Sequence, residues 1–92
     1  MIAETRVTTD KSAIYMKQLC RHFGHKVAVE FNDERGSIEF PFGVCELTAE
    51  PNVLVMRVNA NNDEDFARIK GVVGGHLERF AFREELQVQW PA

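Results

Sequence analysis

The three histidines are the residues best suited to chemistry in this chain. His22 and His25 stand three residues apart, and imidazole nitrogens at this spacing can share a metal ion. Gly24 between them is expected to end a helix in the left-handed conformation, so the same rings also fit a simpler role beside the negative end of the helix dipole. His76 lies at the edge of a second apolar stripe, where it either bonds within the core or contributes to a site.

A second set of residues offers a thiol and an anion clamp. Cys45 alternates with Leu47 toward the expected core, and the sequence shows no cation or helix N-terminus beside it to lower the pKa of its thiol. Arg79 and Arg83 lie one helical turn apart near Glu84, which fits either exposed ion pairs or a clamp for an anionic ligand, because guanidinium groups match carboxylates. We assign no catalytic residue, and an enzyme with Cys45 as nucleophile is the third and least favoured interpretation.

The periodicity of apolar residues predicts the elements that would position these side chains. A strand is expected over residues 5–9, followed by a helix that Thr9 or Asp10 caps, with apolar positions at i, i+3, i+4 and i+7. Alternating apolar residues, separated by polar or proline-containing turns, then predict an antiparallel meander of four strands. The side chains expected on its inward face are Val27, Val29, Phe31, Ile38, Phe40, Cys45, Leu47, Leu54, Met56 and Val58.

A second helix is expected to begin at Asn61 or Asn62, before an acidic first turn. Gly74–Gly75 within it predicts close packing or a bend, since each glycine weakens a helix by about 1 kcal/mol relative to alanine. Alternation over 86–90 predicts a last strand. The expected fold class is α+β in the order β-α-β-β-β-β-α(-β), with an antiparallel sheet of four or more strands and both helices on one face. It resembles the TATA-binding-protein arrangement in architecture only.

Composition limits the classes of protein to which the chain can belong. Its 92 residues suit a single domain, 1–92, with an ordinary hydrophobic content of 45%. The net charge of −3 disfavours nucleic acid and anionic membranes as partners. The chain has no apolar run that could span a bilayer and no secretory N-terminus, so a cytoplasmic location is expected.

Three segments carry a family resemblance over nearly the whole chain. They are LCRHFGHK at 19–26, GSIEFPFGVC at 36–45 and HLERFAFREEL at 76–86. Together they resemble a family of small bacterial proteins known as a domain of unknown function. The polar positions that this family pattern marks are His22, His25, Cys45, His76, Arg79, Arg83 and Glu84.

The resemblance also implies a biological setting. Members of the family look associated with siderophore-interacting flavin reductases, which implies such a reductase, or a small ligand, as partner. We therefore expect a non-enzymatic accessory or binding domain linked to siderophore and iron utilisation, and no cofactor is assigned. The alternative is a small metal- or ligand-binding protein that uses His22, His25 and His76.

The place of any site can be predicted from the break at Pro41–Gly43. A broken strand exposes backbone groups, and nearby glycines permit close approach. The residues expected to gather at one end of the seam between helices and sheet are His22, Phe42, Cys45, His76 and Arg79. The competing interpretation is that these segments only pack the core.

Overall fold

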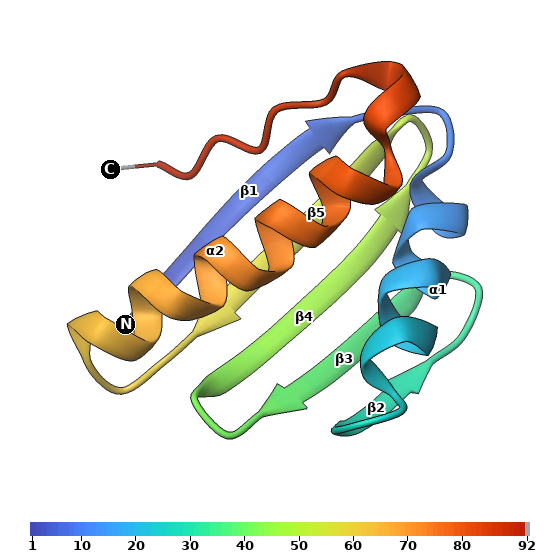
Figure 1. Ribbon diagram of the computed structural model, residues 1–92. Coiled ribbons are helices and arrows are strands. Elements are labelled where there is room, and N and C mark those ends of the chain that lie inside the picture. Colours follow the sequence, from blue (N-terminus) through green and yellow to red (C-terminus); the bar gives the residue numbers. More distant parts are fainter. Residues whose placement is uncertain (92) are drawn as a thin grey trace.

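The structure is a computed structural model that describes residues 1–91 (Figure 1). The helices are α1 (Ser12–Phe23) and α2 (Asp63–Phe80), and a short 3-10 helix, η1 (Phe82–Glu84), follows them. The strands are β1 (Ile2–Thr8), β2 (Ala28–Phe31), β3 (Arg35–Phe40), β4 (Gly43–Glu50) and β5 (Val53–Asn59). The predicted order β-α-β-β-β-β-α is therefore confirmed.

The strands form one five-stranded sheet in the order β1-β5-β4-β3-β2. Every neighbouring pair is antiparallel, so β2 to β5 make the predicted meander and β1 joins it at the edge of β5. Both helices lie on the same face of the sheet, and the opposite face is uncovered (Figure 1). The predicted α+β class is confirmed. None of the described helices is long and apolar enough to cross a membrane.

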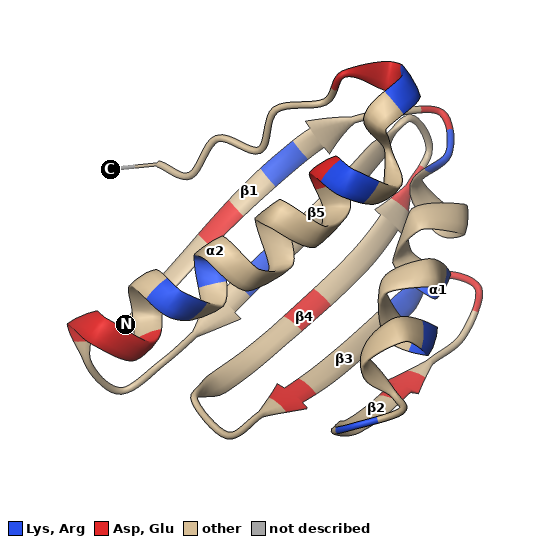
Figure 2. Cartoon of the chain, viewed as in Figure 1, with Lys and Arg blue, Asp and Glu red and all other residues tan. Residues whose placement is uncertain are grey.

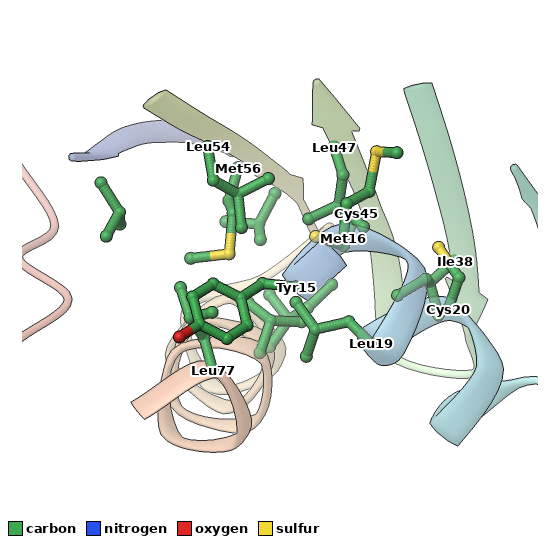
Figure 3. Packing of buried hydrophobic residues seen from close by; sticks show 14 of the residues in the cluster. Tyr15, Met16, Leu19, Cys20, Ile38, Cys45, Leu47, Leu54, Met56 and Leu77 are labelled. Atoms are coloured by element: carbon green, nitrogen blue, oxygen red, sulfur yellow. The ribbon is translucent and has the colours of Figure 1, made fainter. Parts of the chain in front are cut away.

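The core lies between the helices and the inner face of the sheet. The register pairs Val29 with Ile38, Ile38 with Cys45, and Cys45 with Val58, so these side chains share one face as alternation predicts. Phe31 is the exception to the expected inward rows, because it lies on the short edge strand and is 39% exposed. The largest fully buried side chains are Met16, Leu19, Ile38, Leu47, Leu54, Met56, Ile69 and Leu77, most of them visible in Figure 3.

The predicted N-cap of α1 is wrong, and the helix ends at Gly24 as predicted but without the predicted left-handed conformation. The residue before Ser12 is Lys11, which makes no side-chain cap. The hydroxyl of Thr9 accepts a hydrogen bond from the N–H of Lys11, which precedes the helix, so Thr9 does not cap it. Gly24 is right-handed (φ −62°), not left-handed. A Cβ at Gly24 would lie 3.0 Å from both the Cys20 carbonyl oxygen and Val29. Close approach, not a left-handed turn, therefore accounts for this glycine.

The predicted cap of α2 is confirmed at Asn62. Its side-chain oxygen accepts from the Asp65 backbone N–H at 2.8 Å, which satisfies one of the donors that a helix N-terminus leaves free. Acidic residues fill the first turn, as expected from the helix dipole.

The predicted last strand is not formed. Residues 86–90, here called the C-terminal strap, have no regular structure and lie over the inner side of the sheet. The Thr5 hydroxyl donates to the Gln89 carbonyl at 2.5 Å, and the Val88 N–H donates to Glu78 at 2.9 Å. Side chains therefore take the bonds that a strand ladder would need. The alternation correctly predicts burial, because Leu86, Val88 and Trp90 are half-buried against the core.

Candidate functional site

A continuous row of aromatic rings crosses the seam between the two helices and the end of β3. It combines residues from α1, α2, β3 and the β3–β4 turn. Four of its six rings belong to phenylalanine and two to histidine. We call this row the aromatic strip, and its members are His22, Phe23, Phe40, Phe42, His76 and Phe80.

Neighbouring rings of the aromatic strip are in contact. The ring centroids of His22 and His76 are 5.0 Å apart, and those of His76 and Phe23 are 4.8 Å apart. Phe23 meets Phe40 edge-on at 4.9 Å, and Phe40 stacks on Phe42 at the same distance. These separations are those of favourable aromatic pairs. The strip is nevertheless not core, since His22 is exposed and the other rings are only half-buried.

Local structure explains why the sequence brings these rings together. His76 and Phe80 stand four residues apart and so share one face of α2. Phe40 points inward by alternation from Ile38, and the tight turn after it returns the chain at Gly43. Gly43 has φ +156°, and a Cβ there would lie 2.5 Å from a backbone oxygen of β5, so only glycine fits.

The ring of His76 is held in one tautomer. Its Nδ1 lies 2.7 Å from the Val72 carbonyl oxygen. A carbonyl only accepts, so Nδ1 carries the proton and donates it. Nε2 of the neutral ring is left as a lone-pair acceptor, and its orientation is fixed as in a ligating or proton-accepting histidine.

The surroundings of His22 are basic. Desolvation of its ring lowers its pKa below the usual value, and His76, Lys26, His25 and Arg79 lower it further by charge repulsion. No carboxylate among the described residues contributes an opposing effect there. The aromatic strip is thus a locally positive surface on a chain of net charge −3.

The far end of the strip carries a further cation. The guanidinium carbon of Arg68 lies 4.2 Å from the centroid of the Phe42 ring, within the range of a cation–π interaction. Three rings, those of Phe42, Phe40 and Phe23, therefore connect Arg68 to the two imidazoles of His22 and His76.

The structure brings together only part of the predicted site. His22, His76 and Phe42 belong to the aromatic strip, and Arg79 is close enough to affect the pKa of His22. The 5.0 Å between the histidine rings is well inside the two helical turns, about 11 Å, that a shared site allows. His25 makes no ring contact within the described residues and acts on His22 only through its charge.

Cys45 lies outside this site. Its side chain has no exposed surface, and burial raises the pKa of its thiol. A thiol in this environment lacks the thiolate character that a nucleophile needs.

Arg83 and Glu84 also lie elsewhere, at η1. Glu84 accepts hydrogen bonds from the Tyr15 hydroxyl and, at 3.0 Å, from Thr9. It thereby ties η1 to α1. Arg83 lies over the ring of Phe82, its neighbour, at 5.6 Å. Neither Arg79 nor Arg83 makes an ion pair within residues 1–91, so the predicted exposed ion pairs are not formed, and the alternative of an anion clamp stays a prediction.

The three histidines do not assemble a metal centre. Residues 1–91 contain no group of three or more histidine, cysteine, aspartate or glutamate side chains placed to hold an ion. His22 and His76 are a pair, with His25 apart from them.

Sequence reasoning missed several members of the site. Phe23, Phe40 and Phe80 read as core residues because they follow helical or strand periodicity. Each is the last residue of its element, α1, β3 or α2. This position could have indicated that the ring lies at the edge of the core, since elements end where the core ends. Arg68 gave no signal by spacing.

The fold and the site define a small α+β domain of the β-α-β-β-β-β-α type with an exposed aromatic and basic surface. The chain belongs to the family described as "Uncharacterized protein conserved in bacteria (DUF2218)", whose model matches residues 4–91. The expected resemblance to a small bacterial family of unknown function is thereby confirmed.

A solved structure is also similar. The chain is 38% identical to the protein in "NMR structure of PA4090 from Pseudomonas aeruginosa", with a TM-score of 0.83. The match covers 98% of this chain and 94% of that one. No curated protein matches this sequence significantly.

Proposed function

We propose that this chain is a non-enzymatic accessory domain that binds a partner protein through the aromatic strip. The observation that carries the proposal is the line of half-exposed rings, flanked by basic groups, at the seam of α1, α2 and β3. Aromatic residues and arginine are enriched where protein interfaces derive their binding energy.

The shape of this surface favours a protein over a small ligand. Small-molecule sites are concave and enclose most of their ligand. Among five cavities found in the described part of the chain, one includes Phe42 of the strip, and none includes His22 or His76. A shallow row of rings matches a contact patch better.

The proposed partner is a siderophore-interacting flavin reductase, which gives the domain an accessory role in siderophore and iron utilisation. This step rests on the resemblance of the three segments at 19–26, 36–45 and 76–86. It makes a specific test available, because such a reductase can be purified and its binding measured.

Calorimetric titration of the reductase with the domain tests the proposal. The substitutions His76→Ala and Phe42→Ala should each weaken binding at least about tenfold, a loss typical of an interface hot spot. Arg57→Ala, on the open face of β5, is the matched control and should bind like the native chain. Loss of binding without a change in Tm supports the site, whereas a lower Tm with native affinity means that the rings only pack the core.

A second candidate function is metal binding. The free Nε2 of His76 and the adjacent ring of His22 favour it, since neutral imidazole is a ligand for zinc and iron. Two protein ligands leave the remaining positions to water or to a partner. Elemental analysis of tag-free protein offered zinc and iron decides it, and less than about one-tenth equivalent of metal excludes the idea.

A further inference from the structure

The titratable groups that face His22 from α2 and from the turn after α1 are all basic. His76 and Arg79 approach from α2, and His25 and Lys26 from the turn. The C-terminus of α1 contributes partial negative charge, which these cations offset. Side chains here therefore carry an unbalanced positive charge on an acidic protein.

Around the imidazole end of the strip, the remaining described elements supply no carboxylate, whereas Asp65 lines a cavity with Phe42 at the far end. β3 contributes the ring of Phe40, while Glu39 next to it alternates onto the open face of the sheet. Glu78 of α2 is engaged with the Val88 N–H of the C-terminal strap. Within the described residues, the positive end of the strip has no counter-ion of its own.

His76 opposes the protonation of His22. The two ring centroids are 5.0 Å apart, and two cations at that distance repel. Repulsion adds to the desolvation that already lowers the pKa of His22. A carboxylate placed beside the pair would reverse the effect, because an opposite charge favours the protonated ring.

We propose that the aromatic strip recognises a protein segment with aromatic and acidic side chains, and that His22, beside His76, takes up a proton when a carboxylate of that segment binds. The inference rests on the proposed function and adds the chemistry of the partner to it. The basic groups around His22 favour an acidic side chain in the partner by charge complementarity. The row of rings favours an aromatic side chain, because aromatic rings pair favourably with one another.

A protein segment suits this surface better than a small anion. The strip runs from the imidazole pair through Phe23, Phe40 and Phe42 to Arg68, so successive side chains of an extended segment can each meet a ring. A small anion would use only the imidazole end and would find no enclosing cavity there.

A pair of synthetic peptides tests the proposal on the labelled native domain by NMR. One short capped peptide alternates phenylalanine and glutamate, and its partner has glutamine in place of glutamate. Affinity is read from the shifts of residues 22–26, 40–43 and 76–80 at about pH 5.5 and about pH 7.5, where glutamate stays ionised and histidine titrates. Sodium benzoate serves as the small aromatic anion.

The glutamate peptide should bind up to about tenfold more tightly at the lower pH for each unit by which binding raises the pKa of His22. The direction follows because the pKa of His22 is lowered in the free domain, so that this ring gains a proton on binding. The glutamine peptide should bind more weakly and equally at both values. His22→Gln should remove the pH dependence, and Arg57→Gln should keep it.

Three results would overturn the inference. Equal binding of both peptides, or binding independent of pH, refutes carboxylate recognition but leaves the strip as a contact surface. Benzoate that matches the glutamate peptide in affinity and pH dependence assigns the site to a small anion. If neither peptide binds while the reductase binds and His76→Ala weakens that binding, the strip does not recognise an acidic aromatic segment. The proposed function then stands without this inference.

Discussion

At the residue scale, Tyr15 carries the clearest electrostatic signature in the structure. It is the one tyrosine of the chain and is only 6% exposed. Burial, followed by its hydrogen bond to Glu84, raises the pKa of Tyr15 to about 12. The same bond lowers the pKa of Glu84. The pair joins α1 to η1 and so anchors the start of the C-terminal strap.

The first prediction concerns the titration of this phenol. Absorbance near the tyrosinate band should show a single ionisation with a midpoint at about 12 in place of 10. Because the folded pKa is raised, the stabilisation is fully present below pH 10 and is lost as pH rises through about 12. Glu84→Gln should lower the midpoint, but not fully to 10, since burial remains. Tyr15→Phe controls for other groups, and a native midpoint near 10 would contradict the buried bond.

The second prediction concerns the two thiols. Cys20 and Cys45 are fully buried, and burial raises the pKa of Cys20 to about 11 and that of Cys45 further. At neutral pH both should resist a chromogenic disulfide reagent in the native domain and react only as fast as the protein unfolds. Denaturant provides the positive control. Rapid reaction of one thiol in the native state would restore the nucleophile interpretation.

At the element scale, α2 contains a natural pair of test positions. A Cβ at Gly74 would lie 3.3 Å from Val88 and from the indole nitrogen of Trp90, whereas one at Gly75 would meet nothing within 4 Å. Of the two alternatives for these glycines, close packing thus applies to Gly74. It accommodates the C-terminal strap.

The third prediction follows from this difference. Gly75→Ala should raise the free energy of unfolding by up to about 1 kcal/mol through helix propensity. Gly74→Ala gains the same propensity but forces Val88 and Trp90 to move, so its stability should fall clearly below that of Gly75→Ala. Urea unfolding of both variants measures the difference. Equal stabilities would mean that the strap does not rest on Gly74.

Elements were predicted where one physical signal decides the outcome. The spacing of apolar residues predicts the helices and four of the strands. The side-chain oxygen of Asn62 caps α2, as expected for an asparagine at that position. Prediction failed where two long-range groups compete for a bond. The strap alternates like a strand, but the Thr5 hydroxyl takes the Gln89 carbonyl, a contact between chain positions 84 residues apart that local pattern cannot reveal.

The candidate site shows the same limit. The placement of His22 near His76 was predictable because a helix end and a second helix share one seam. The separation of Cys45, Arg83 and Glu84 from that seam was not predictable. Cys45 shares the inner face of the sheet with Phe40 but is fully buried in the core, and Arg83 and Glu84 lie in η1, beyond the end of α2.

At the scale of the whole molecule, the two faces of the sheet differ in their charges. The basic aromatic strip lies on the helix side, and Figure 2 shows acidic bands on β2, β3 and β4, where Glu30, Glu39 and Glu46 alternate onto the open face. The register places Glu46 beside Arg57, and Arg57 beside Glu4, so the open face alternates in sign. An uncovered antiparallel sheet offers a broad surface for nucleic acid, but the glutamates on this open face repel phosphate groups.

The last prediction is that neither DNA nor RNA binds the open face. Glu30, Glu39 and Glu46 are exposed there, and the chain has a net charge of −3, so phosphates gain no counterion release. Gel-shift assays should show no complex at about micromolar protein in low salt. The triple change Glu30→Lys, Glu39→Lys and Glu46→Lys reverses the sign of the net charge and should create weak binding that salt abolishes. Because these side chains point away from the core, the variant should keep the native Tm within a few degrees. Salt-sensitive binding by the native chain would show instead that the positive strip on the other face, and not a protein partner, governs its interactions.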